Sequence, residues 1–347
     1  MVDDSAVIRH LVTIALGSDP GIEVVGTAPD GQVAIEETRR LMPDAITLDV
    51  EMPVLDGLGA LRVIREEQPR LPVIMFSTVT EKGAAKTLEA LSLGASDYVT
   101  KPSQVGSIQE SVRSVRDQLV PKIKALCGIR AVAAGVPRTQ HVPLVLPDGP
   151  AAPLQRVDVL AIGCSTGGPD ALAHLVSVLP ADLPVPVVVV QHMPPVFTKM
   201  FAERLDKASP LQVHEAVDGQ PLLPGHVLIA PGDFHLRVVR DTGTVFAALD
   251  AGPAENFCRP AVDALFRSVS EVYAARGVGI VLTGMGQDGL IGCELLRSVG
   301  AEVLVQDEES SVVWGMPGAV ANAGLAHAVV PLSGLAARIG ESVARDR

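Results

Sequence analysis

Three residues whose side chains suit hydrolysis each follow an apolar run. Ser165 lies in VLAIGCSTGGPDAL (159–172), His192 follows PVVVVQ, and Asp288 lies in VGIVLTGMGQDGL. A serine becomes a nucleophile when an imidazole takes its proton, and a carboxylate that binds the imidazole fixes its tautomer. If the three runs are parallel strands, their carboxyl ends meet at one edge of the sheet. The sequence therefore predicts a Ser–His–Asp triad at that edge.

The glycine-rich turn around Ser165 allows a second interpretation. Gly163, Ser165 and Gly167 fit the G-x-S-x-G nucleophile elbow, but such a turn at a helix start also suits a phosphate. The dinucleotide fingerprint and the P-loop lysine are both absent, which favours the nucleophile. Asp288 alone could be an ordinary cap of the helix that follows it. The order Ser, His, Asp also differs from that of the α/β-hydrolases, so the triad would be a separate one.

A second group of polar residues lies near the start of the chain. Its members precede a helix or end an apolar run: Asp3, Asp4, Asp49, Ser77 and Lys101. Each alone could be a solvated surface residue. Together, at matching strand ends, carboxylates with a hydroxyl and a lysine suit Mg²⁺ and phosphoryl chemistry at one carboxylate.

Two α/β units must position these groups. In the first unit, apolar runs at 22–27, 44–49, 72–77 and 96–100 predict strands. Amphipathic stretches predict helices at 5–16, 31–42, 58–68, 82–94 and 107–126. Strand alternating with helix predicts a parallel sheet covered on both faces.

The second unit begins after an Ala-, Pro- and Gly-rich stretch. Strands are predicted at 157–163, 186–191, 277–284 and 301–306, and helices at 169–179, 196–207, 260–273 and 289–300. Short strands at 225–231, 234–239 and 244–250 suggest an antiparallel edge. The expected organisation is a first domain at 1–126, a linker at 127–156 and a second domain at 157–347.

Composition excludes several classes of protein. The net charge of −12 gives no basic footprint for nucleic acid. The four cysteines form no C-x-x-C pair, so neither a zinc site nor a disulfide framework is expected; Cys164 should be buried without a chemical role. No apolar run is long enough to span a membrane and no signal peptide opens the chain, so we expect a cytoplasmic protein.

Residues 1 to about 120 resemble the receiver domain of two-component response regulators through VDDSAVIRHL, LDVEMPVLDGL, MFST and YVTKP. The resemblance implies a flavodoxin-like fold with Asp49 as phosphoacceptor. It implies an Mg²⁺ site formed by Asp4, Asp49 and the Glu51 backbone carbonyl, with Asp3 acting through water. It further implies Ser77 as switch hydroxyl, Lys101 as phosphate contact and Tyr98 as the rotating aromatic residue.

One departure from the receiver pattern concerns the first strand. Only Met1 and Val2 precede the acidic pair, where receivers have about five apolar residues. Each buried aliphatic side chain contributes ~1.5–3 kcal/mol, and a whole domain has a stability of only ~5–15 kcal/mol. We therefore expect a truncated first strand here, and a native chain that starts upstream of Met1.

The second unit resembles the catalytic domain of chemotaxis protein-glutamate methylesterases over about 157–345, through AIGCSTGG, QHMPP, RPAVDALFRSV, VLTGMGQDG and VVWGMPGAV. The resemblance implies a doubly wound α/β domain with Ser165 as nucleophile, His192 as base and Asp288 as the orienting carboxylate. It also implies the backbone N–H of Met285 as an oxyanion donor and Thr166 as an active-site neighbour.

The combined resemblance implies a reaction and its partners. Glutamate methyl esters on the cytoplasmic helices of chemoreceptors would be hydrolysed to release methanol, and specific glutamines would be deamidated, without a cofactor for the esterase step. A chemotaxis histidine kinase would supply the phosphoryl group, and the unphosphorylated receiver would cover the catalytic face. The alternative is a non-enzymatic binding module controlled by phosphorylation, which the intact Ser, His and Asp argue against.

Overall fold

The computed structural model describes residues 1–102, 107–128 and 156–345. The chain forms two compact units, Met1–Val136 and Pro137–Arg347, and each is described by itself. Most of the predicted linker at 127–156 lies outside the described residues. No helix in the described part is long and apolar enough to cross a membrane.

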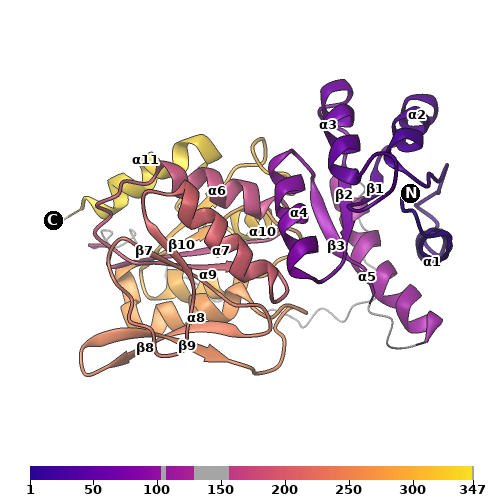
Figure 1. Cartoon of the computed structure of the whole chain (residues 1–347). Coiled ribbons are helices and arrows are strands. Elements are labelled where there is room, and N and C mark those ends of the chain that lie inside the picture. Colours follow the sequence, from indigo (N-terminus) through magenta and orange to yellow (C-terminus); the bar gives the residue numbers. More distant parts are fainter. Residues whose placement is uncertain (103–106, 129–155, 346–347) are drawn as a thin grey trace. The chain divides into compact units, whose positions relative to one another are not determined.

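The first unit has a parallel sheet in the order β1-β2-β3. Its strands are β1 (Ile46–Asp49), β2 (Val73–Ser77) and β3 (Asp97–Thr100). Its helices are α1 (Ala6–Gly17), α2 (Gly31–Leu41), α3 (Gly57–Glu67), α4 (Glu81–Ser92) and α5 (Ile108–Leu126). Helices α1 and α5 pack together on one face, whereas α2, α3 and α4 follow one another on the other (Figure 1). Both faces are therefore covered, as predicted.

Each helix of this unit begins at a residue that caps it. The side-chain oxygen of the N-cap accepts a hydrogen bond from a backbone N–H of the first turn, which otherwise lacks a partner. The caps are Ser5, Asp30, Asp56, Thr80 and Ser107. These local signals explain why the predicted helix starts lie within two residues of the observed ones.

The prediction of a strand at 22–27 is wrong. The segment has no strand pairing, and only Ala28 forms a bridge, to Val2, which in turn bridges Leu48. Val2 is thus the one residue before the acidic pair that enters the sheet, so residues 22–27 lack a neighbouring strand with which to pair. A cavity of about 360 Å³ lies beside them, lined by residues that include Ile22, Val24, Thr47 and Ile123.

The second unit is built on a seven-stranded parallel sheet in the order β12-β11-β10-β4-β5-β7-β6. The strands are β4 (Val159–Cys164), β5 (Val187–Gln191), β6 (Gln212–Glu215), β7 (His226–Ile229), β10 (Gly277–Val281), β11 (Glu302–Gln306) and β12 (Ala328–Val330). The chain leaves β4 towards β5 and later returns to β10 on its other side. Such a reversal of strand order leaves a crevice at the carboxyl ends of the strands, where open α/β sheets place their ligands.

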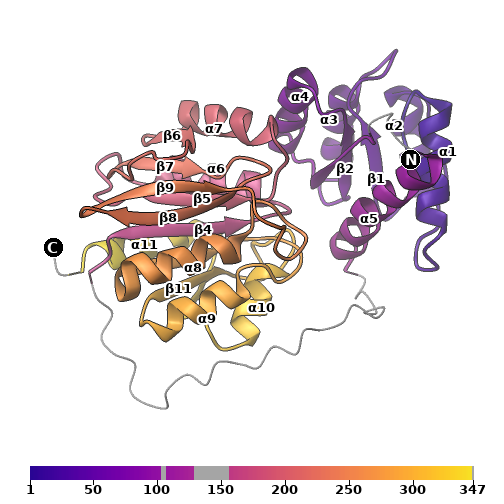
Figure 2. The same cartoon turned by 90° about the horizontal axis from the view of Figure 1, so that it is seen from below.

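Helices cover both faces of this sheet. Helices α6 (Gly168–Val178), α7 (Phe197–Ala208) and α11 (Leu332–Val343) pack with one another on one face. Helices α8 (Val262–Tyr273), α9 (Leu290–Ser298) and α10 (Met316–Asn322) lie on the other (Figure 2), and the short helix η1 (Ala274–Arg276) follows α8. Buried apolar side chains of the sheet and of the helices on this second face form one core cluster, which includes Val159, Val188, Phe266 and Val303.

Of the three short strands expected at an antiparallel edge, two pair as predicted and one does not. Strands β8 (His235–Asp241) and β9 (Thr244–Asp250) form an antiparallel hairpin that packs on α8. Strand β7, expected at the same antiparallel edge, instead pairs in parallel with both β5 and β6. Its run Val227–Ile229 is buried on both faces, which is typical of a parallel strand.

Candidate active site

Ser165 and His192 follow neighbouring strands at the same edge of the sheet. Cys164 at the end of β4 is opposite Gln191 at the end of β5, so the next residue of each strand is Ser165 and His192. The backbone N–H of His192 donates to the Cys164 carbonyl at 3.1 Å, and the N–H of Ser165 donates to the Thr283 carbonyl at 3.0 Å. These backbone bonds hold both residues at the crevice between β4 and β10.

The turn after Ser165 is tight because small residues surround it. Gly167 has a φ of 75°, which favours glycine, and α6 begins directly after it with Pro169 in its first turn. At Gly284, a Cβ atom would lie 2.4 Å from the Met316 sulfur and 2.9 Å from the Ser165 Cβ. Glycine at 284 therefore lets the loop after β10 approach the serine closely.

The His192 ring is bound to Asp288. The distance between His192 Nε2 and Asp288 Oδ2 is 2.8 Å, and both side chains are largely buried. Burial by itself would lower the pKa of His192, but the hydrogen bonds and charge interactions with Asp288 and Cys258 together outweigh burial and raise that pKa above its ordinary value. The structure thus brings two of the three predicted triad residues into direct contact.

Asp288 caps a helix, but not the one that follows it. The N-cap of α9 is Gly289, which has no side-chain cap bond. The Asp288 carboxylate instead accepts the backbone N–H groups of Val262 at 2.7 Å and Asp263 at 3.1 Å, at the start of α8. The alternative interpretation as a cap of the following helix is therefore wrong: the carboxylate is held at another helix N-terminus, where backbone dipoles favour negative charge.

These contacts keep Asp288 ionised. Burial raises the pKa of its carboxyl, but hydrogen bonds from His192 and the backbone N–H groups of Val262 and Asp263 reverse that effect and hold the pKa below its usual value. An ionised carboxylate can only accept hydrogen bonds, so His192 Nε2 carries the proton that it donates to Asp288. In the neutral imidazole, Nδ1 is then the ring nitrogen that carries the lone pair.

Cys258 contacts that nitrogen and was not among the residues that the sequence singled out. Its Sγ lies 3.6 Å from His192 Nδ1. No motif marks Cys258, which reaches the site from the loop before α8.

Among the described residues, the Ser165 hydroxyl has no hydrogen-bond partner. Cys164 is fully buried as expected, and burial raises the pKa of its thiol far above the usual value.

The two predicted neighbours of the serine, Thr166 and Met285, lie in the turn after β4 and the loop after β10. Thr166 is buried, and its carbonyl accepts the Thr283 hydroxyl at 2.9 Å. Met285 is half-buried in the loop between β10 and Asp288. Within the described chain, the backbone N–H of Met285 donates to no acceptor. It is therefore available to a ligand at this edge.

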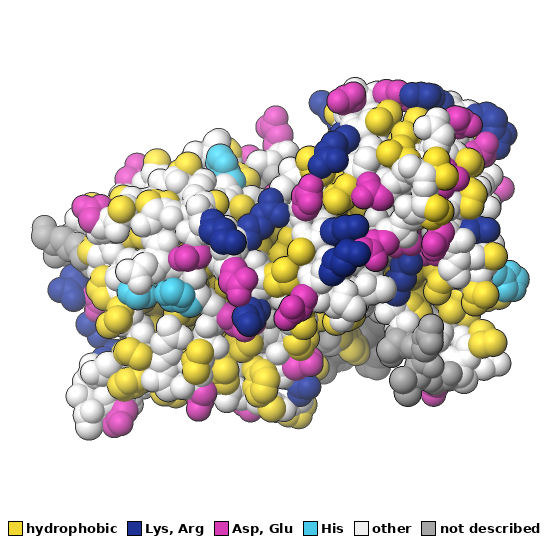
Figure 3. All heavy atoms as spheres, in the orientation of Figure 1, with side chains coloured by type: hydrophobic (Ala, Val, Ile, Leu, Met, Phe, Trp, Pro, Cys, Tyr) yellow, Lys and Arg dark blue, Asp and Glu magenta, His cyan; other side chains and the backbone are white. Residues whose placement is uncertain are grey.

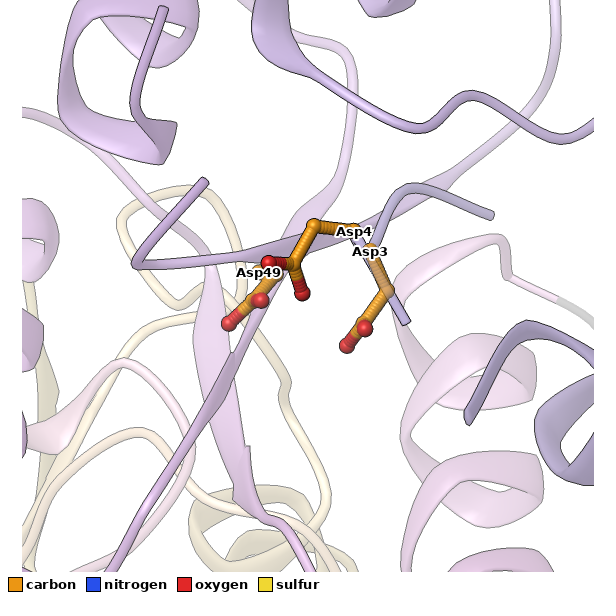
Figure 4. A group of neighbouring side chains, drawn as sticks. All are labelled: Asp3, Asp4 and Asp49. Carbon is orange, nitrogen blue, oxygen red and sulfur yellow. The ribbon is translucent and has the colours of Figure 1, made fainter. Parts of the chain in front are cut away.

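In the first unit, three carboxylates converge at the end of β1. One oxygen each of Asp3, Asp4 and Asp49 lies within 4.8 Å of the others, and Figure 4 shows the Asp4 and Asp49 side chains next to each other. Lys101 Nζ lies 2.8 Å from both Asp3 Oδ2 and Asp49 Oδ2. Burial raises the pKa of Asp49 to about 6, against the opposing hydrogen bond from Lys101. The donor set is the all-oxygen kind that Mg²⁺ prefers.

The remaining predicted receiver residues are not all turned to these carboxylates. The Ser77 hydroxyl donates to the Gly83 carbonyl at 3.2 Å, in α4, rather than to Asp49. Tyr98 is buried, with Lys122 Nζ 5.6 Å from its ring centre. The Glu51 carboxylate, at the loop expected to supply a carbonyl ligand, pairs with Lys82 at 2.9 Å and Lys86 at 3.2 Å from α4.

Comparisons with known proteins match the two units of the chain to two different domain families. The CheB methylesterase family matches residues 160–339, and the response regulator receiver domain matches residues 1–113. The chain is 51% identical over 352 residues to a protein-glutamate methylesterase/protein-glutamine glutaminase of a Nocardioides species, covering all of this chain and 95% of that one. The chain belongs to the CheB methylesterase family. It carries the family's catalytic domain behind a receiver domain.

Other CheB proteins support the assignment over both units. The protein-glutamate methylesterase/protein-glutamine glutaminase of Trichodesmium erythraeum is 48% identical over 345 residues, covering 98% of this chain and 97% of that one. The crystal structure of the Thermotoga maritima CheB methylesterase catalytic domain covers 54% of this chain and 99% of its own, with 43% identity and a TM-score of 0.53. On the face drawn in Figure 3, acidic and basic side chains are interspersed.

Proposed function

We propose that the chain is a protein-glutamate methylesterase and protein-glutamine glutaminase that uses Ser165, His192 and Asp288 as a triad and is regulated by phosphorylation of Asp49. The observation that carries the proposal is the 2.8 Å contact between His192 and Asp288 at the sheet edge where Ser165 follows the neighbouring strand. The names of its relatives and the CheB match support the same reaction. Its domains are taken as 1–126, 127–156 and 157–347.

The geometry supports one sequence of proton transfers. The Ser165 oxygen attacks the ester carbonyl carbon while its proton passes to His192 Nδ1, and Asp288 stabilises the imidazolium that forms. The tetrahedral intermediate breaks its C–O bond to the methoxy group, which takes the proton and leaves as methanol. Water then attacks the acyl-enzyme with the same base, and the products are glutamate and free Ser165. With a glutamine side chain, the first leaving group is ammonia.

The negative oxygen of the intermediate needs hydrogen-bond donors. The backbone N–H of Met285 fits this role because it lies in the loop that Gly284 brings against Ser165. One such donor contributes roughly a hundred- to a thousandfold in rate. Thr166 fixes the other side of the turn through its bond to Thr283.

In the receiver, Asp49 is proposed to accept the phosphoryl group from a chemotaxis histidine kinase. The carboxylates of Asp3, Asp4 and Asp49 fit Mg²⁺, with the Glu51 carbonyl as a further ligand and Asp3 acting through water. The ion neutralises charge on the transferring phosphoryl group when it is bound. Lys101 is positioned to contact that group because it already pairs with Asp49. Ser77 and Tyr98 are the proposed switch residues.

The substrates are proposed to be the cytoplasmic helices of methyl-accepting chemoreceptors, so the enzyme acts in the cytoplasm. Phosphorylation would shift an equilibrium from a covered to an uncovered catalytic face. Neither nucleic acid nor membrane insertion has a part in this proposal.

The decisive experiment measures methanol release from methylated receptor membranes. Ser165→Ala should lower the rate by a factor on the order of 10⁴ or more, and His192→Ala by nearly as much. A fluorophosphonate probe should label the wild type at Ser165. Wild-type methanol release by Ser165→Ala would refute the triad, and unlabelled Ser165 with no methanol release would favour a binding module.

A further inference from the structure

A tight turn lies against the proposed triad and plays no part in the steps above. Glu255 and Cys258 close the turn: the N–H of each donates to the carbonyl of the other, at 3.1 and 2.8 Å. The two central residues, Asn256 and Phe257, have φ values of 51° and 63°. Positive φ at both positions defines a type I′ turn, which asparagine tolerates and phenylalanine does not favour. The Phe257 side chain is 93% exposed, so its packing does not hold the turn.

The side-chain amide of Asn256 holds this turn in place. Its Nδ2 donates to Asp288 Oδ1 at 2.9 Å and to Asp263 Oδ2 at 2.8 Å. Both carboxylates are about 2% exposed. Two buried carboxylates this near each other cannot both stay charged without a donor between them, and otherwise they share a proton. The two N–H groups of one amide supply a donor to each.

Asp263 is the weaker acid of this pair. Its Oδ1 accepts the Gly292 N–H at 2.7 Å. Burial, together with the charge of Asp288, raises the pKa of Asp263 to about 6. Other titratable or charged groups surround the pair on every packed element: His192 after β5, Glu255 and Cys258 in the turn, Arg267 on α8, and Cys293 and Glu294 on α9. Arg267 is bound to Glu255 at 2.6 Å and so stabilises the turn.

We propose that Asn256 is a positioning residue of the triad: its amide keeps Asp288 ionised and aimed at His192 by bridging Asp288 to Asp263. The inference rests on the proposed function of Asp288. Asn256 touches neither the substrate nor Ser165, so its effect passes through the Asp288 carboxylate. A donor to a buried charged group is among the stronger hydrogen bonds, which sets the size of the expected effect.

Without the amide, Asp263 and Asp288 share a proton. Although Asp263 is the weaker acid, a proton shared between the two carboxylates removes part of the charge on Asp288, so His192 loses part of the charge that stabilises its imidazolium. Raising the pH removes the shared proton and restores the charge. The variant should therefore be impaired most at neutral and acidic pH and recover as the pH rises.

The test compares two glycine substitutions in the same turn of the full-length chain. Asn256→Gly removes the amide but accepts the positive φ, whereas Phe257→Gly relieves backbone strain without touching the carboxylates. We expect Asn256→Gly to lower kcat for methanol release about ten- to a hundredfold with little change in KM, and to move the acidic limb of the pH profile upward. Phe257→Gly should keep both the rate and the profile of the wild type.

A second variant links the shift to Asp263. In an Asp263→Asn background, the Asn256→Gly substitution should no longer move the acidic limb, because there is no second acid to share the proton. The proposal is overturned if folded Asn256→Gly keeps wild-type kcat and pH profile, or if Phe257→Gly loses as much activity. If Asn256→Gly does not fold, Asn256→Ser, which keeps one donor, is judged by the same criteria. Failure of the triad itself would be recognised separately, as activity that survives His192→Ala.

Discussion

The two proposed sites both lie at the carboxyl ends of parallel strands, but the carboxylates of Asp288 and Asp49 differ in the hydrogen bonds that they accept. Asp288 accepts hydrogen bonds from His192, Asn256 and three backbone N–H groups. Asp49 accepts one from Lys101 and a long one of 3.5 Å from the Glu51 N–H. Accordingly, the pKa of Asp288 is lowered and that of Asp49 is raised to about 6. This difference fits the proposed roles: the carboxylate proposed to keep one orientation accepts many hydrogen bonds, and the carboxylate proposed to react and bind a cation accepts few.

The helices of the two units show a related contrast. Every helix of the receiver has a side-chain cap within its own segment, whereas the N-caps of α6, α7, α8, α9, α10 and α11 make no side-chain cap bond. The start of α8 is satisfied by Asp288, which lies 26 residues from Val262 in the chain. The proposed catalytic geometry and the stability of α8 are therefore coupled in the second unit, whereas each helix start of the first unit is capped locally.

The largest expected effect comes from removing the Asp288 carboxylate, which accepts hydrogen bonds from several donors. Asp288→Ala should lower the rate of methanol release by a factor on the order of 10⁴, somewhat less than the loss of the nucleophile. It should also destabilise the start of α8, which hydrogen exchange at Val262 and Asp263 can measure. Because the pKa of Asp288 is lowered in the fold, its stabilising effect is present above its unfolded pKa of about 3.9 and is lost as the pH falls through its folded value. Normal exchange protection in Asp288→Ala would separate the two roles and break the comparison.

A large effect is also expected from a group added to Cys258. Its thiol touches His192 Nδ1, so a methylthio group attached by a methanethiosulfonate reagent would occupy the space at the base. Activity should fall at least tenfold and return with dithiothreitol. Cys258→Ala should resist the reagent, since Cys164 and Cys293 are buried, and Cys127→Ala should remain sensitive. Equal inactivation of Cys258→Ala would place the sensitive thiol elsewhere.

Asp49, whose carboxylate accepts few hydrogen bonds, should matter for regulation and not for ester hydrolysis itself. Asp49→Asn should leave basal methanol release unchanged but abolish the response to acetyl phosphate and Mg²⁺. Couplings between sites are typically about 5- to 150-fold, and deletion of residues 1–130 should raise basal activity within that range if the receiver covers the catalytic face. A full chain as active as that fragment, with no response to the phosphodonor, would contradict the covering.

The sequence predicts those parts of the structure that depend on local signals, and it does not predict those that depend on contacts between distant residues. Local signals were enough for the receiver helices, because each cap lies next to the helix that it starts. The edge shared by Ser165 and His192 was also predictable, since apolar runs before them form parallel strands. Asp288 as the cap of α8 was not, because its partners come from a distant helix start. Asn256 and Cys258 were missed for the same reason, and the strand expected at 22–27 fails because only Val2 enters the sheet beside it.

The smallest expected effect tests the local caps of the receiver. Asp56 caps α3 by accepting the Gly59 N–H at 2.9 Å. Asp56→Ala should weaken the first turn of α3 by ~0.5–2 kcal/mol, which speeds exchange of the Gly59 amide about 2- to 30-fold. The matched control is Asp241→Ala, which removes the same charge from an exposed position of β8 and should leave Gly59 unchanged. Methanol release should stay at the wild-type level in both variants, because no proposed catalytic residue depends on either side chain. If Asp56→Ala instead lowers catalysis while Asp49 still accepts phosphate, receiver helix starts are coupled to the esterase after all, and the separation drawn between the two units does not hold.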